Sequence, residues 1–141
     1  MLRVLFAFAL LLLSMAPGHA QSLAPADEAA VKEAITGQLQ AFATDNDAGA
    51  YAYAAPLVKG IFPDTDTFMA MVKKGYQPVY RSKSHSFGEA FVDNLGRPAQ
   101  RVIINAADGK RYEAVYTMER QPDGTWKIAG CYLIEVPSVD A

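Results

Sequence analysis

The residues that could carry acid–base chemistry are tyrosines and carboxylates. An isomerase that removes a proton from a carbon atom next to a carbonyl group needs a carboxylate base. It also needs a tyrosine and a protonated acid as hydrogen-bond donors to the oxyanion that develops. Glu113 and Glu119 alternate with an apolar series that runs from Tyr112 to Met118, so we expect both carboxylates to face solvent. No carboxylate shares an apolar face with a tyrosine, which argues against an isomerase. The other members of the two sets are Tyr51, Tyr53, Tyr116, Tyr132, Glu89, Asp93 and Glu135.

His85 and Cys131 offer two further kinds of chemistry. His85 is the only histidine after residue 20, and a single imidazole cannot form a His-rich metal site. It lies in a Lys/Ser-rich segment, which favours an exposed polar side chain over a general base. Cys131 is the only cysteine, so the chain has neither an internal disulfide nor a CxxC motif, and a buried apolar role is favoured over a redox thiol. We therefore predict no catalytic residue, no metal and no cofactor.

Three aromatic side chains are candidates for ligand binding. Tyr116 lies on the apolar face of a predicted strand, and Trp126 follows a tight turn at the start of the next strand. Tyr51 and Tyr53 lie on different sides of one predicted helix, so at most one of them directs its hydroxyl into a pocket. Each candidate also has an ordinary packing role, and for Trp126 that role is favoured. We predict that Tyr51, Tyr116 and Trp126 bind a ligand.

The segment from Arg111 to Val136 predicts a β-hairpin that positions several of these residues. Its turn is Gln121-Pro122-Asp123-Gly124, in which proline suits the second position of a type I turn and glycine accepts the positive φ that follows. Before the turn, apolar residues alternate with polar ones. After it, both parities are apolar, so we expect the middle of the second strand to be buried on both faces.

Three helices are predicted before the sheet. The first begins at Pro25 and ends near Ala43; Gly37 within it suggests the close approach of another element. The second covers 49–55, with Asp45 or Asp47 as its cap. Pro56 ends or kinks this helix, and one further turn is expected before Lys59-Gly60. The third runs from 63–66 to Gly75.

The chain is predicted to turn to β structure from Pro78 onward. A long strand or two pieces cover 78–92, with a bulge or bend at Gly88, and another strand covers 100–105. Short connections favour antiparallel neighbours. We therefore predict an α+β fold, with three N-terminal helices packed on a curved four-stranded antiparallel meander, forming a cone that leaves a pocket at its open end.

Residues 1–20 have the pattern of a secretory signal peptide. Arg3 precedes the apolar run 4–13, and Gly18-His19-Ala20 places small residues before a cleavage site after Ala20. The apolar run is too short to span a bilayer, and no cysteine follows the cut. We therefore expect a periplasmic or secreted single domain over 21–141, with no membrane attachment after processing. Its formal charge changes from −2 to −3 when Arg3 is removed, which does not indicate nucleic-acid binding.

Four motifs resemble a known family: Ile35-x-x-Gln38-x-x-Ala41-Phe42, Ala50-Tyr51-x-Tyr53-Ala54-x-Pro56, Phe68-x-x-Met71-Val72-x-x-Gly75-Tyr76-x-Pro78-Val79 and Trp126-Lys127-Ile128-x-Gly130-Cys131-x-Leu133. Together they resemble the secreted bacterial family catalogued as domain of unknown function forty-eight sixty-four, a branch of the nuclear transport factor 2-like, or ketosteroid isomerase-like, superfamily. The resemblance covers almost the whole chain after the signal peptide. It implies the α+β cone and carries no assigned activity. In the superfamily that cone hosts isomerases, dehydratases, small-ligand binders and dimerisation modules, so the fold does not decide the function.

The sequence thus predicts an exported, non-catalytic domain that binds a small apolar ligand or associates with itself or a partner, for example as a homodimer through the sheet. One alternative is an isomerase, dehydratase or hydrolase that uses the cone pocket. Its distinguishing feature is a buried carboxylate, or His85, directed into the cavity beside a tyrosine hydroxyl. Another alternative is a subunit of an exported multi-protein system.

Overall fold

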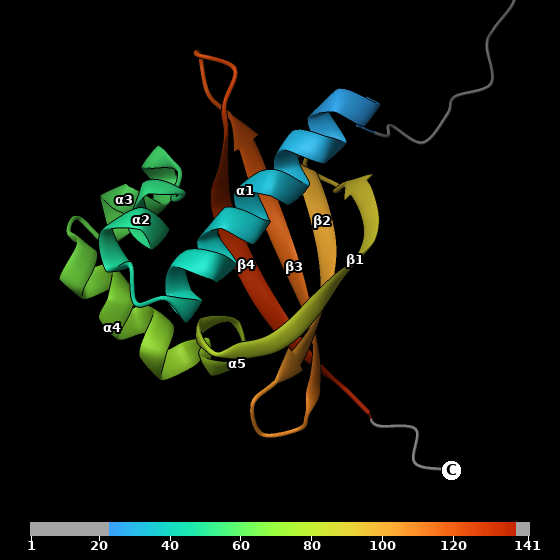
Figure 1. Cartoon of the computed structure of the whole chain (residues 1–141). Helices are drawn as coiled ribbons and strands as arrows, with labels where there is room; N and C mark the ends of the chain where they lie inside the picture. Colours follow the sequence, from blue (N-terminus) through green and yellow to red (C-terminus); the bar gives the residue numbers. More distant parts are fainter. Residues whose placement is uncertain (1–22, 138–141) are drawn as a thin grey trace, which may run out of the picture.

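The computed structural model describes residues 23–137, so the predicted signal peptide at 1–20 lies outside the described residues. Within that range five helical segments precede four strands (Figure 1). The helices are α1 (Pro25–Ala43), α2 (Asp47–Ala52), α3 (Pro56–Ile61), α4 (Thr65–Gly75) and α5 (Gln77–Tyr80). The strands are β1 (Ser82–Val92), β2 (Pro98–Ala106), β3 (Arg111–Arg120) and β4 (Trp126–Val136).

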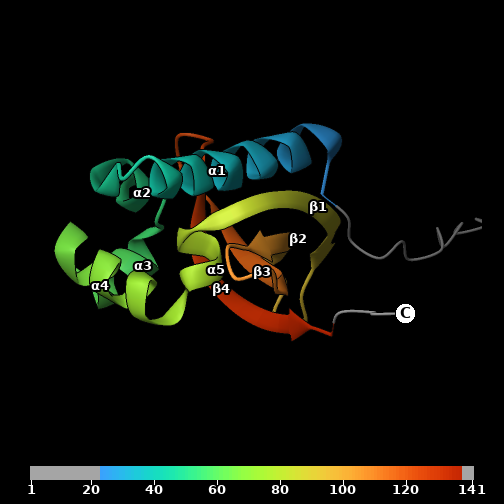
Figure 2. The ribbon, with the colours of Figure 1, turned by 60° about the horizontal axis from the view of Figure 1, so that its bottom comes forward.

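The four strands form one antiparallel sheet in the order β1-β2-β3-β4, which confirms the predicted α+β fold and meander. The sheet curves without closing into a barrel, and α1 crosses its concave face (Figure 2). α2, α3 and α4 gather beyond β4 (Figure 1). A short parallel bridge between Ala54 and Ile128 ties the segment between α2 and α3 to the free edge of β4.

Helix α1 buries one apolar stripe against the sheet. Val31 and Ile35 are fully buried, and Phe42 near the helix end is almost so. The predicted close approach at Gly37 is confirmed, because a Cβ atom there would lie 2.2 Å from the hydroxyl oxygen of Tyr53. Glycine is therefore required in this helix by the ring that packs across it, despite its lower helix propensity.

Three local predictions about the helices were wrong. The cap of α2 is Asn46, whose Oδ1 accepts a hydrogen bond from Gly49 N at 3.0 Å, rather than Asp45 or Asp47. Pro56 begins the separate helix α3 instead of ending α2, because proline suits the first turn of a helix, where its missing N–H would be unpaired anyway. Pro78 likewise lies in the first turn of α5, where a strand had been predicted.

The hairpin turn was predicted correctly. Gly124 has a φ of +86°, and its N–H donates to the carbonyl of Gln121 at 2.9 Å. The predicted irregularity near Gly88 is also confirmed, because the β1–β2 register shifts between Phe87 and Ala90. The turn rests on the positive φ of Gly124, a conformation that glycine adopts readily, whereas the φ of Gly88 is not positive.

The predicted burial of β4 on both faces was wrong. Met118 pairs with Ile128 whereas Thr117 pairs with Gly130, so Ala129 is an extra residue without a partner in β3. Such a bulge moves every later side chain to the opposite face. Tyr132 and Ile134 therefore lie on the outer face, where they are 51% and 46% exposed.

Candidate functional site

A cavity of about 280 Å³ lies between the helical layer and the strands β3 and β4. α1, α3 and α4 supply one wall, the bulged part of β4 supplies the other, and Tyr116 of β3 lies between them. The lining residues are Gln38, Phe42, Ala54, Val58, Ile61, Phe62, Phe68, Met71, Val72, Tyr76, Val79, Tyr116, Ile128, Ala129, Gly130 and Cys131. Among the described residues, no charged side chain belongs to this lining.

Burial of the lining residues shows which end of the cavity is deep. Tyr116, Phe42 and Val72 are buried, whereas Val58 and Phe62 are half-buried. Ile61, at the end of α3, is 65% exposed. The cavity therefore opens beside α3 and ends at Tyr116.

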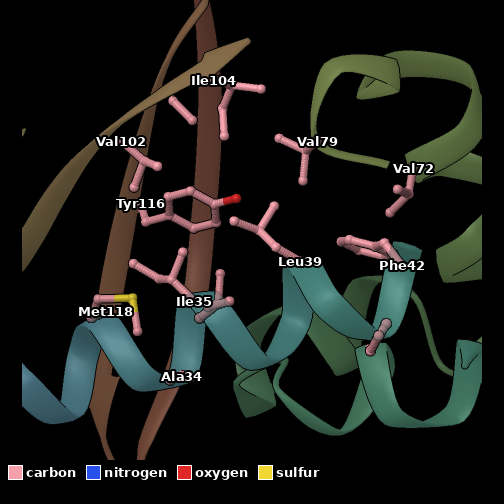
Figure 3. Close-up of a cluster of buried hydrophobic side chains, with 14 of the residues drawn as sticks. Ala34, Ile35, Leu39, Phe42, Val72, Val79, Val102, Ile104, Tyr116 and Met118 are labelled. Carbon is pink, nitrogen blue, oxygen red and sulfur yellow. The ribbon is translucent and has the colours of Figure 1, made fainter. Parts of the chain in front are cut away.

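The hydroxyl of Tyr116 is the principal polar group at the deep end. The residue is 1% exposed, and its hydroxyl oxygen has no hydrogen-bond partner within residues 23–137. Figure 3 shows this oxygen pointing away from β3 toward Leu39 and Val79. Burial is the main reason that the pKa of Tyr116 lies well above its usual value of 10.0, with the Cys131 side chain as a further cause. The hydroxyl therefore stays protonated and can donate a hydrogen bond.

Two other polar groups of the lining already have partners. The Tyr76 hydroxyl donates to the Cys131 carbonyl at 2.9 Å, and Gln38 Nε2 donates to the Ala50 carbonyl at 3.1 Å. The first bond connects the end of α4 to β4, and the second connects α1 to α2. Both therefore fix the cavity walls.

Cys131 reaches the cavity because of the bulge at Ala129, which places it directly across from Tyr116. As a residue it is only half-buried, since its backbone lies at the sheet edge, but burial of the thiol raises its pKa to about 12, an effect that the Tyr116 hydroxyl partly offsets. A thiol with this pKa is almost entirely protonated at neutral pH. The side chain therefore acts as a weakly polar part of the wall.

Comparison with known protein families matches residues 24–141 to the family described as "Domain of unknown function (DUF4864)". The chain belongs to this family. The comparisons with curated proteins and with solved structures gave no match. The predicted family is thus confirmed, and membership of DUF4864 assigns no activity to the chain.

In this DUF4864 chain, the three residues predicted to bind a ligand lie in three different environments. Tyr116 lines the cavity. The Tyr51 ring packs against Phe68 with 5.3 Å between the ring centroids, and its hydroxyl donates to the Phe62 carbonyl at 2.6 Å, so it supports the wall from behind. Trp126 is a buried core residue and does not line the cavity.

The carboxylates and the histidine weighed for acid–base chemistry lie outside the cavity. Among the described residues, no Asp, Glu or His side chain lines it. Glu113 pairs with Arg101 on the outer face, and the His85 ring contacts Phe87 of β1 with 5.5 Å between the centroids. Residues 23–137 also contain no group of three or more His, Cys, Asp or Glu side chains that could hold a metal ion.

Sequence reasoning did not assign Gln38, Tyr76 or Cys131 to the site. The motifs contain all three, but their periodicity shows only that they belong to helices and a strand. For Cys131, a signal was the cluster Ala129-Gly130, two small residues in a strand, which is compatible with a bulge. In the described part of the chain, no helix is long and apolar enough to cross a membrane.

Proposed function

We propose that this chain is an exported, non-catalytic protein that binds a small, mainly apolar ligand in the cavity between α1, α3, α4 and β4. The observation that carries the proposal is the Tyr116 hydroxyl, which faces a mainly apolar cavity and has no hydrogen-bond partner in residues 23–137. A buried hydroxyl without a hydrogen bond destabilises a protein by about 1–3 kcal/mol. A ligand that supplied an acceptor would remove this penalty, and its apolar part would cover the aromatic and aliphatic wall.

The size and polarity of the cavity support a small ligand. Its volume of about 280 Å³ is near the lower end of the range of ~300–1,000 Å³ that is typical of small-molecule pockets. Such pockets combine an apolar wall with a few polar groups that fix orientation, and the lining described above has this character.

The alternative of an isomerase, dehydratase or hydrolase has less support. That chemistry needs a base within hydrogen-bond reach of the substrate. The tyrosine hydroxyl is present, but the lining in residues 23–137 includes neither a carboxylate nor His85. Binding is therefore the function that the cavity supports best.

A pair of substitutions on α3 tests ligand binding. Val58 lines the cavity, whereas its neighbour Leu57 is 62% exposed and does not. We expect α-methylstyrene, an apolar probe, to bind the wild-type chain and Leu57→Trp but not Val58→Trp, whose side chain fills the mouth. Chemical shifts of the Met71 methyl group report the binding. If the probe does not bind the wild-type chain, or if it binds Val58→Trp equally well, the proposal is wrong.

Self-association is a second candidate, favoured by the exposed outer face of β4. Tyr132 and Ile134 are both exposed there and lie beside Val115 and Glu113, their partners on β3. Aromatic residues such as tyrosine are enriched at protein interfaces. A second copy of the chain would cover them. Sedimentation of the wild-type chain and of Tyr132→Lys tests this: a wild-type monomer would contradict the proposal.

Export is part of the proposal because of the signal-peptide pattern at 1–20. The nuclear transport factor 2-like fold is proposed on the resemblance described above and on the curved sheet crossed by α1. Expression of the full chain in a Gram-negative bacterium, followed by mass spectrometry of the periplasmic fraction, tests export. We expect a product that begins at Gln21; a cytoplasmic product that retains Met1 would contradict this.

A further inference from the structure

The polarity of the cavity changes along its depth. The deep end holds the Tyr116 hydroxyl beside the Cys131 thiol. The mouth is formed by apolar residues of α3, including the strongly exposed Ile61, and Leu57 one turn earlier extends this apolar surface outward. Proteins that hold an apolar tail inside and a charged head outside have the opposite arrangement, with polar groups at the mouth.

The lining also excludes charge. Within the described residues it has no Lys, Arg, His, Asp or Glu side chain. An ionised carboxylate or ammonium group at the deep end would lose its hydration without gaining a counter-ion, which is strongly unfavourable. One tyrosine hydroxyl would not compensate for this loss, so the buried end of a ligand must be neutral.

The hydrogen-bonding role of the deep end follows from the state of its groups. Tyr116 keeps its proton, and its hydroxyl has no hydrogen-bond partner in residues 23–137, so its O–H needs an acceptor. The adjacent thiol is a weak hydrogen-bonding group and meets this need poorly. A neutral oxygen acceptor at the tip of the ligand meets it fully.

From these observations we infer that the cavity selects a neutral ligand with an acceptor oxygen, such as a ketone, which enters oxygen first so that its apolar body lies toward α3. This inference rests on the proposed ligand-binding function. It specifies the class of ligand and its direction, and it places the recognising contact at Tyr116.

The test compares two probes of almost equal shape, acetophenone and α-methylstyrene, in which C=O and C=CH2 occupy the same place. We expect Tyr116→Phe to weaken acetophenone binding by about 2- to 10-fold, as the loss of one neutral hydrogen bond predicts, and to leave α-methylstyrene binding unchanged. Tyr112→Phe is the matched control, because it removes the same oxygen atom from another tyrosine of β3 that does not line the cavity. It should change neither affinity.

Two further measurements on the wild-type chain do not depend on a variant. The carbonyl stretch of bound acetophenone should move to lower frequency than in an apolar solvent, and its aromatic protons should show nuclear Overhauser effects to the Ile61 methyl groups. Benzoate, the charged probe, should bind at least about 10-fold more weakly than acetophenone.

The outcomes separate this inference from the proposed function. Suppose that α-methylstyrene binds, that Tyr116→Phe binds acetophenone as tightly as the wild-type chain does, and that the carbonyl stretch does not shift. The inferred ligand class is then wrong, and ligand binding stands. Benzoate that binds as tightly as acetophenone overturns the requirement for a neutral ligand. If neither neutral probe binds the wild-type chain, the proposed function fails, and the inference fails with it.

Discussion

The two ends of the interior differ in how well they are filled. Beneath the middle of α1, Val31 and Ile35 meet Val102 and Ala114 of the sheet, and all four are completely buried. Beneath α3 and α4, the same interior holds the cavity, and α3 has no fully buried residue. One layer of helices thus covers one end of the sheet tightly and leaves the other end open.

This difference follows from the length of the helices. α1 has 19 residues and a continuous apolar stripe, whereas α3 has six and is held to β4 at Ala55, whose N–H donates to the Ile128 carbonyl at 2.8 Å. A short helix cannot bury a complete face. The α1 end therefore contains the tight packing, and the α3 end contains the cavity.

The largest expected effect tests the filled end. Ile35→Ala should lower the free energy of unfolding by about 2–5 kcal/mol, because it leaves a void in a close-packed interior. Ile61→Ala makes the same chemical change at the mouth, where the side chain is 65% exposed. It should lower the free energy by no more than about 0.5 kcal/mol. Urea unfolding measures both values, and similar losses would contradict the division into two ends.

Two glycines sharpen the comparison with a smaller effect. A Cβ at Gly37 would collide with the Tyr53 ring, so Gly37→Ala should lower the free energy of unfolding by about 1–3 kcal/mol. Gly60, in α3, has nothing within 4 Å of the place where a Cβ would be. Gly60→Ala should therefore raise the free energy by about 0.5–1 kcal/mol, because alanine favours the helix.

Thermal unfolding of the two glycine variants gives the measurement. A Gly60→Ala variant that is destabilised as much as Gly37→Ala would mean that α3 packs closely in solution. That result would contradict the open end.

The filled end could be predicted from sequence, and so could a pocket near Tyr116, but the part of β4 that lines the pocket could not. The apolar repeat of α1, the turn at Gly124 and the alternation along β3 depend on local patterns, and all three were predicted correctly. The cavity depends on the bulge at Ala129, a single extra residue whose effect on later side chains appears only when the strand is paired. Proline has a similar ambiguity, because it can end one helix or begin another, as at Pro56.

Two tyrosine hydroxyls test the polar part of the cavity. Tyr76→Phe removes a hydrogen bond to the Cys131 carbonyl and should lower the free energy of unfolding by about 0.5–1.5 kcal/mol. Tyr116→Phe removes a buried hydroxyl that has no partner in residues 23–137, so in the absence of ligand it should raise the free energy, by about 1 kcal/mol. Urea unfolding distinguishes the two signs. A destabilised Tyr116→Phe would show that the hydroxyl has a partner in solution.

The last prediction concerns the ionisation of Cys131, which does not affect stability at neutral pH and lowers it only in alkali. Burial raises the pKa of its thiol from 9.0 to about 12, so the folded chain keeps a proton that the unfolded chain releases. The stabilisation from this difference is complete below pH 9 and is lost as the pH rises toward 12. The stability of the wild-type chain should therefore fall more steeply over this range than that of Cys131→Ala.

Tyr76 and Tyr116, whose pKa values are also raised by burial, are present in both chains and contribute a common background. Urea midpoints at pH 8 and pH 10.5 for the two chains give the comparison. If both chains lose the same stability between these two pH values, water reaches the sulfur. The deep end of the cavity would then be as wet as its mouth. The apolar, protonated environment on which recognition of a neutral ligand depends would then be absent.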